Sequence, residues 1–261
     1  MSSTSRARTP WPVGALAILG AVAVAVPVLA LLVRAPWSDL GALGRSGAWT
    51  ALRLSLVVSL SAAALSVALG APLAFVLARA RVPGRAVLRA VALLPLVLPP
   101  VVGGIALLAA LGREGLVGRW LAKGGIHLPF TTAGAVVATT FVSMPLVVIA
   151  VEAGLRSMPA GYERAAASLG ASRGYVLRHV TLPMLRPQLV AGAVLAWARA
   201  LGEFGATITF AGNLAGRTQT LPLQVFQAQQ TDPGAAILAS LLLVGLSIGV
   251  LVAMRGRLFP R

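Results

Sequence analysis

The sequence has no cysteine and few residues of the kinds that carry chemistry: one lysine, two histidines and six acidic residues among 261. The absence of cysteine excludes disulfides, thiolate metal ligands and thiol nucleophiles. His127 and His179 lie far apart in the sequence and the acids are scattered, so no triad, metal cluster or carboxylate pair can be assembled. We therefore predict no catalytic residue, no metal site and no cofactor bound by this chain.

Charge is also scarce, at 11% of residues, whereas 58% are hydrophobic and the mean hydropathy is +0.89. Such a chain has too little polar surface to cover a soluble domain, which predicts an integral membrane protein. The net charge of +16 does not indicate nucleic-acid binding, because the arginines fall in short clusters between apolar segments. This layout is typical of a membrane topology signal in an all-α, polytopic protein.

Six apolar segments are long enough to span a bilayer as helices. They cover about Val13–Val33, Leu54–Ala78, Val87–Leu111, Thr131–Leu155, Pro187–Ala211 and Gly234–Met254. The first segment follows a charged start and has small residues suited to signal-peptide cleavage, but its length favours a retained helix.

The domain organisation follows from these spans. We predict a cytoplasmic lead over residues 1–12, a six-helix domain over 13–254 and a cytoplasmic tail over 255–261. With the N-terminus inside, fourteen Lys and Arg fall in cytoplasmic segments, seven fall in outer segments, and Arg199 lies within a span. Because positive residues favour the cytoplasmic side, both termini and the loop 157–186 are predicted to be cytoplasmic.

The segment Tyr162–Pro183 is polar and basic, and it separates two long apolar segments. Its pattern predicts a short helix over Glu163–Leu169 that ends at Gly170, since glycine readily takes the left-handed conformation that ends helices. Ser172 can cap a second helix from about Arg173, and Pro183 is expected to end it. The resulting helix-turn-helix has a small apolar face that suits docking in a groove of another protein. An ordinary basic loop is the alternative.

ATP hydrolysis by this chain is excluded by the lack of a phosphate-binding loop. Such a loop needs a lysine that directly follows a glycine, whereas the single lysine, Lys123, follows Ala122. If ATP drives this protein, a separate subunit binds it.

The third span contains Pro95, Pro99 and Pro100, each of which removes a backbone donor. The helix is therefore expected to kink or break near the middle of the membrane. Freed backbone groups are costly in hydrocarbon unless they line a wet cavity or are buried in protein, so this break is a candidate part of the transport pathway or gate. A kinked packing helix is the alternative.

The fifth span holds two intramembrane charges, Arg199 and Glu203, with Thr207 continuing the same helical face. Four residues apart, the two charges can pair. Charges at this depth are functional candidates for the pathway, while a pair that fixes helix packing is the structural alternative.

The cytoplasmic segment resembles the coupling signature of permeases of ATP-binding-cassette importers, which dock on the ATPase through this loop. The residues to which the resemblance assigns ATPase coupling, together with Leu169 from the apolar face, are Glu163, Ala165, Ala166, Leu169, Gly170, Val180, Leu182 and Pro183. Valine stands at 180 where the signature has isoleucine, and Arg164 separates the glutamate from the alanines.

Further stretches, LPLVLPPVVGG, ARALGEFGATITFAGN and RTQTLPLQVF, resemble the membrane subunits of molybdate importers, with sulfate/thiosulfate permeases as the nearest relatives. This resemblance implies a type I importer permease fold in a prokaryotic plasma (inner) membrane. It implies a homodimer, two ATPase subunits that bind ATP and Mg, and a periplasmic or lipid-anchored oxyanion-binding protein. Selectivity is expected in that binding protein, because a dianion would be repelled by Glu203 unless Arg199 neutralised it.

Two other classes stay open as alternatives. A proton-coupled secondary transporter would use Glu203 as a proton carrier, but it would usually show inverted repeats, and none is found in the sequence. A membrane-embedded enzyme would need a cluster of titratable residues, which the sequence does not provide.

Overall fold

The structure is a computed structural model that describes residues 10–80 and 82–258. Most of the predicted N-terminal lead, Arg81 and the end of the predicted C-terminal tail lie outside the described residues. Within them every regular element is helical. Five helices are long and apolar enough to cross a membrane. These are α1 (Trp11–Arg34), α3 (Ala48–Arg79), α7 (Thr132–Ser157), a continuous helix over Arg173–Leu201 and α13 (Pro233–Leu258). The all-α, multi-pass class is confirmed.

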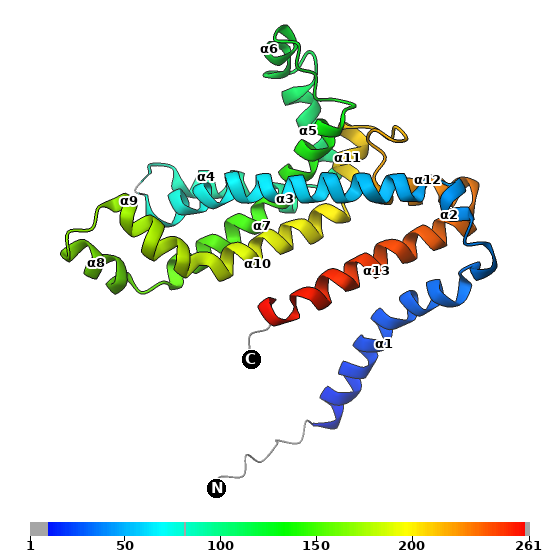
Figure 1. Cartoon of the computed structure of the whole chain (residues 1–261), viewed down its shortest axis with the longest axis horizontal. Helices are drawn as coiled ribbons and strands as arrows, with labels where there is room; N and C mark the ends of the chain where they lie inside the picture. Colours follow the sequence, from blue (N-terminus) through cyan, green and yellow to red (C-terminus); the bar gives the residue numbers. More distant parts are fainter. Residues whose placement is uncertain (1–9, 81, 259–261) are drawn as a thin grey trace.

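The centre of the molecule is a bundle of α3, α7 and α10 (Leu182–Leu201), which lie side by side (Figure 1). Small residues let these helices approach closely: a Cβ on Gly70 of α3 would lie 3.2 Å from Met144, and one on Gly192 of α10 would lie 3.1 Å from Ala150. Ser66 and Ser143 share a buried hydrogen bond of 3.0 Å across the α3–α7 contact. Close backbone approach and interhelical hydrogen bonds are the usual means of association in a bilayer.

The third predicted span is not a single helix. It consists of α4 (Arg85–Val97) and α5 (Pro100–Leu111), separated by extended backbone at Leu98 and Pro99. The predicted break is thus confirmed, and it occurs here because consecutive prolines deny the helix two donors. Figure 1 shows α4 folded back along the bundle, while α5 leads away from it toward α6 (Gly118–Lys123).

The fifth predicted span is wrong at both ends. Its helix begins at Arg173 with α9 (Arg173–Val176), passes through the π-helical turn η2 (Leu177–Thr181) and continues as α10. Pro183 therefore does not end the second helix of the cytoplasmic segment. The Leu182 N–H donates to the Leu177 carbonyl, five residues back, and the wider turn makes room for the proline ring. The helix then breaks after Leu201 and resumes as α11 (Gly205–Phe210).

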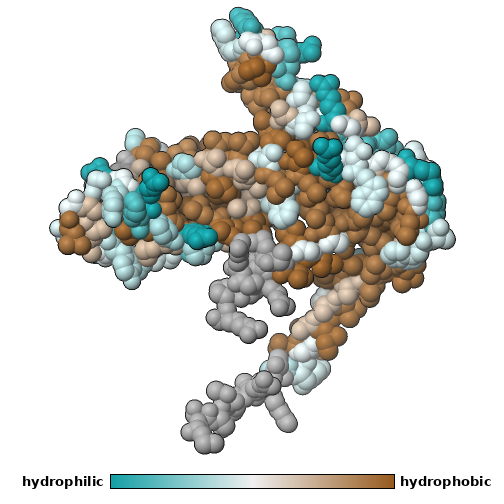
Figure 2. All heavy atoms as spheres, viewed as in Figure 1, coloured by the Kyte–Doolittle hydropathy of each residue, from teal (hydrophilic) through white to brown (hydrophobic). Residues whose placement is uncertain are grey.

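The remaining elements lie toward the two ends of the bundle. Beyond the C-terminal end of α7 lies α8 (Ala160–Ser168); at the opposite end lie η1 (Trp37–Asp39), α2 (Ala42–Arg45) and α12 (Leu221–Thr231), with α12 packed on α13. No residue of α1 is buried. Figure 2 shows hydrophobic residues along the helices and hydrophilic ones gathered at the two ends and around α6. This distribution fits a chain that spans a bilayer.

Candidate functional site

The predicted helix-turn-helix is present at the end of the bundle where α7 finishes. α8 closes with a Schellman motif, in which the Gly170 N–H donates to Ala167 (3.0 Å) and the Ala171 N–H to Ala166 (3.1 Å). Gly170 has φ +83°, and the Ser172 hydroxyl caps α9 by accepting from the Tyr175 N–H at 3.3 Å. Both local predictions are confirmed.

The apolar face of this segment points to solvent. Leu169 is 89% exposed, Ala165 is exposed and Ala166 is half-buried. The second group of predicted coupling residues lies on η2 and the start of α10, where Val180, Leu182 and Pro183 are also not buried. An exposed leucine beside a tight glycine turn is the geometry that inserts into a groove.

Glu163 differs from its neighbours because its carboxylate binds two other residues of the same chain. One oxygen, Oε2, lies 2.9 Å from Nη1 of Arg79 at the end of α3. The other, Oε1, accepts a hydrogen bond of 2.8 Å from the Thr181 hydroxyl on η2. The side chain is 23% exposed. Glu163 therefore fastens α8 to two other helices.

A second carboxylate near this end of the bundle was not assigned a role from the sequence. Glu152 on α7 pairs with Arg156, one turn later, at 2.9 Å and also with Arg89 of α4. Its side chain is 9% exposed. The spacing of Glu152 and Arg156 was the available signal, whereas the pairing with Arg89 depends on α4 folding back along α7. The Glu152–Arg89 pair attaches α4, the helix that precedes the proline break, to α7 of the bundle.

The two helix breaks, about a hundred residues apart in sequence, meet in space. A Cβ on Gly205, at the start of α11, would lie 2.7 Å from Cβ of Pro100 at the start of α5. One turn along, a Cβ on Gly104 would lie 2.5 Å from Cβ of Thr209. Glycine is thus required on both helices, and the structure places Pro100, a pathway candidate of the third span, against the start of α11 in the fifth span.

Arg199 and Glu203 form the pair that their spacing predicted. Nη1 of Arg199 lies 2.5 Å from Oε2 of Glu203, while Oε1 accepts from the Ala206 N–H at 2.8 Å. Glu203 is 3% exposed, so its carboxylate is neutralised by the arginine and occupied as the cap of α11. This geometry favours the structural interpretation of the pair.

The other pathway candidates differ in their exposure to solvent. Pro99 and Pro100 are exposed at the break, whereas Pro95 is buried within α4. Thr207 is 1% exposed, and its hydroxyl has no hydrogen-bond partner among the described residues. No group of three or more acidic or histidine side chains within 10–80 and 82–258 is arranged to hold a metal ion.

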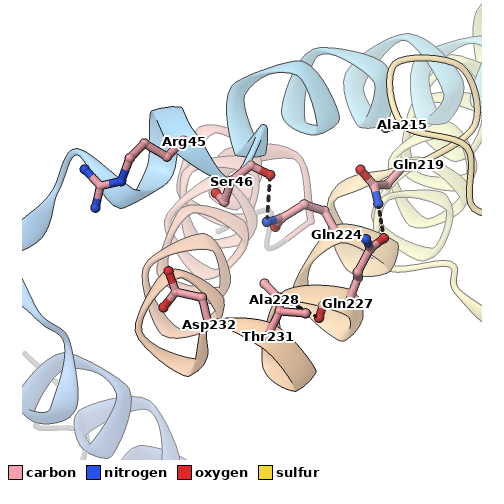
Figure 3. A pocket seen from close by; sticks show the side chains of 9 residues that line it. All are labelled: Arg45, Ser46, Ala215, Gln219, Gln224, Gln227, Ala228, Thr231 and Asp232. Atoms are coloured by element: carbon pink, nitrogen blue, oxygen red, sulfur yellow. Dashed lines mark hydrogen bonds between the residues drawn. The ribbon is translucent and has the colours of Figure 1, made fainter.

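The end of the bundle opposite the helix-turn-helix has a polar cavity of about 340 Å³ between α2 and α12 (Figure 3). Gln219 donates to Gln227 at 2.7 Å, and Gln224 reaches the Ser46 carbonyl at 3.4 Å. The Oε1 atom of Gln224 is buried without a partner among the described residues. Amides with a free acceptor suit a hydrogen-bond donor, not an oxyanion, which offers only acceptors.

Comparison with known proteins bears on the whole chain. Residues 67–258 match the family model described as "binding-protein-dependent transport system inner membrane component". The molybdenum transport system permease protein ModB of Mycobacterium tuberculosis is 51% identical over 244 residues, which cover 92% of each protein. The sulfate transport system permease protein CysT of Escherichia coli is 40% identical over 214 residues, covering 79% of this chain and 77% of that protein.

A solved structure supports the fold. The structure of a bacterial ABC transporter involved in the import of the acidic polysaccharide alginate includes a chain that superimposes with a TM-score of 0.72. The match covers 96% of both chains at 15% sequence identity, so the likeness is one of fold alone.

Proposed function

Because this chain belongs to the family of binding-protein-dependent transport system inner membrane components, we propose that it is the membrane subunit of an ATP-driven molybdate importer. The observation that carries the choice of molybdate is the 51% identity to a molybdenum permease across 92% of both chains. The chain forms the translocation pathway and takes no part in ATP chemistry itself. ATP and Mg are bound by the partner ATPase.

Coupling to the ATPase occurs through the helix-turn-helix between Tyr162 and Pro183. Two structural observations support this coupling role. Leu169 is 89% exposed, and the Gly170 turn fixes α8 relative to α9. A preorganised apolar anchor loses little conformational entropy on docking. Two copies of the permease, each docked on its own ATPase, form the working unit, and closure of the ATPases opens the pore outward.

The pathway passes the meeting point of the two helix breaks, where Pro99 and Pro100 are exposed. Backbone that leaves the helix at this depth is tolerated where it lines a cavity or is buried in protein. Glu203 does not repel a dianion there, because Arg199 pairs with it. Selectivity then belongs to the binding protein, and the pore passes the anion without holding it tightly.

The distribution of positive charge supports an orientation in which both termini and the helix-turn-helix lie in the cytoplasm of a prokaryote. The end of the bundle with α2, α6 and α12 then faces outward, toward a periplasmic or lipid-anchored oxyanion-binding protein.

Uptake into proteoliposomes tests this proposal. The vesicles hold the permease with its ATPase and enclose ATP, with the binding protein and labelled molybdate outside. We expect ATP-dependent uptake that tungstate blocks and excess sulfate does not. Vesicles that contain a non-hydrolysable ATP analogue are the control. Uptake without ATP would contradict the proposal.

Sulfate or thiosulfate transport is the second candidate, because CysT is 40% identical over most of its length. Block of molybdate uptake by sulfate in the same vesicles would favour it. A proton-coupled mechanism is distinguished by an uncoupler: with internal ATP held constant, uptake by a proton-coupled transporter collapses, whereas uptake by an ATP-driven one continues.

A further inference from the structure

A second cavity, of about 680 Å³, lies at the N-terminal end of α7. The helix-turn-helix follows the other end of this 26-residue helix, about 39 Å away at 1.5 Å per residue. We call this cavity the outer basic pocket and define it by the side chains of Arg113, Glu114, His127, Phe130 and Arg217, which line it. Its walls come from the connection between α5 and α7 and from the loop after α11.

The two loops that form the pocket are fastened together. The Thr132 hydroxyl donates to the Arg217 carbonyl at 2.7 Å, and the Phe130 N–H donates to Phe210 at 3.4 Å. A Cβ on Gly212 would lie 2.9 Å from the ring of Phe130, so the loops also touch through side-chain packing. Phe130 has φ +59°, a conformation that bulky residues rarely adopt unless the surroundings impose it. These contacts therefore hold the two loops of the pocket in a fixed arrangement.

Positive charge at this pocket is not neutralised by direct pairing. Neither Arg113 nor Arg217 takes part in a salt bridge within the described part of the chain, and neither does Glu114, the one acid of the lining. Arg45, by contrast, is paired with Asp39 at 2.5 Å near the same end of the bundle. Two exposed guanidinium groups that lack a carboxylate partner, against the single carboxylate of Glu114, give the pocket an excess of positive charge that attracts negative groups.

The size and lining of the pocket decide which anion it fits. A tetrahedral oxyanion occupies roughly 100 Å³, about that of three waters, so it would be loosely held in 680 Å³. Apolar side chains, including Leu108 and Phe130, make up part of the wall, and they offer nothing to an oxyanion. A protein loop with an acidic residue beside apolar ones satisfies both features, and arginine and aromatic side chains are the usual anchors of such interfaces.

We infer that the outer basic pocket is the docking site for an acidic loop of the oxyanion-binding protein, whose carboxylates pair with Arg113 and Arg217. This inference rests on the proposed function, which places the pocket on the outer side and supplies the partner. Pairing of this kind governs the association rate and makes binding sensitive to salt.

Affinity of the binding protein for the intact permease–ATPase complex in nanodiscs tests this inference. The variants are Arg113→Gln, Arg217→Gln and a double charge reversal that combines Arg113→Glu with Arg217→Glu. The control is Arg119→Glu on α6, which reverses the charge of one arginine as the double variant does at each of its two positions. Its guanidinium lies 5.5 Å from the Trp120 ring and does not line the pocket. We expect the double reversal to weaken binding at least about tenfold, and each neutralisation about threefold, as for charged interface anchors.

Two further readouts separate docking from misfolding and from bulk charge. Basal ATP hydrolysis without binding protein is expected to be the same in all variants, and added salt should weaken docking to the parent more than to the double variant. The Arg119→Glu control should stay within about twofold of the parent, as expected for a rim charge outside the contact.

Several outcomes would overturn the inference. One is unchanged affinity in the double variant with reduced molybdate uptake, which would indicate a site for the free anion. An equal loss in Arg119→Glu would indicate a general effect of surface charge. If the binding protein neither binds the parent complex nor stimulates its ATPase, the proposed function fails too, and this result is distinct because it needs no variant.

Discussion

Nη1 of Arg79 and Oε2 of Glu163 lie 2.9 Å apart and join the end of α3 to the helix that carries the exposed Leu169. The second carboxylate oxygen accepts a hydrogen bond from Thr181, so each oxygen has a partner within the chain. The resemblance assigned Glu163 to ATPase coupling by residue type. The structure gives it an internal partner on each side, so it holds α8 in place against α3 and η2.

The first prediction concerns this pair. Glu163→Gln and Arg79→Ala should each leave the free energy of unfolding within about 1 kcal/mol of the parent, because a partly exposed ion pair contributes little. Both should raise the ATP hydrolysed per molybdate imported, since α8 loses its attachment to α3. A double-mutant cycle on that ratio is the measurement: the double variant should be no worse than either single one. Additive losses would mean that the two residues act separately.

The second prediction concerns the turn at Gly170. Gly170→Pro should abolish ATP-coupled uptake, because proline cannot adopt φ +83° and cannot donate to Ala167. The matched variant is Gly170→Asn, since asparagine tolerates the left-handed conformation and a Cβ here meets nothing within 4 Å. It should retain most of the uptake. Membrane insertion should be normal in both variants, and normal uptake in Gly170→Pro would remove the docking assignment.

The third prediction tests the contact between the two helix breaks. Gly205→Ala places a methyl group 2.7 Å from Pro100 and should lower the free energy of unfolding in detergent by about 1–3 kcal/mol. Gly202→Ala is the control, because its Cβ meets nothing within 4 Å and its φ of −93° suits any residue. Its effect should stay within about 0.5 kcal/mol. Equal effects would mean that α5 and α11 do not pack as described.

The fourth prediction separates the two roles of Glu203. Glu203→Ala removes both the partner of Arg199 and the cap of α11, and should destabilise the protein by about 3–5 kcal/mol. Glu203→Gln keeps an acceptor for the Ala206 N–H and should cost less. Uptake driven by ATP should survive in Glu203→Gln, measured in proteoliposomes at matched protein levels. Its loss in a correctly folded variant would instead support a proton carrier at this position.

Features with a local cause could be predicted from the sequence. Hydropathy located α1, α3, α7 and α13. Consecutive prolines predicted the break at Leu98 and Pro99, and the cytoplasmic segment has its helix-ending glycine and capping serine at the predicted positions. The pairing of Arg199 with Glu203 followed from helical spacing alone.

Features that depend on packing could not be predicted. Pro183 was expected to end a helix, and nothing local indicates that a π-helical turn will carry the chain past it. The internal partners of Glu163 come from segments 84 and 18 residues away. The outer basic pocket combines two loops that only the fold brings together.

The π-helical turn η2 has a mechanical consequence. Because the helix from Arg173 to Leu201 is continuous over 29 residues, it acts as a rod of about 44 Å between the docking turn and the break before Glu203. A π-turn adds one residue to a helical turn, which rotates everything beyond it by about 100° relative to an ordinary helix. That single extra residue therefore sets the direction in which the Arg199–Glu203 pair faces relative to the Gly170 turn at the other end of the helix.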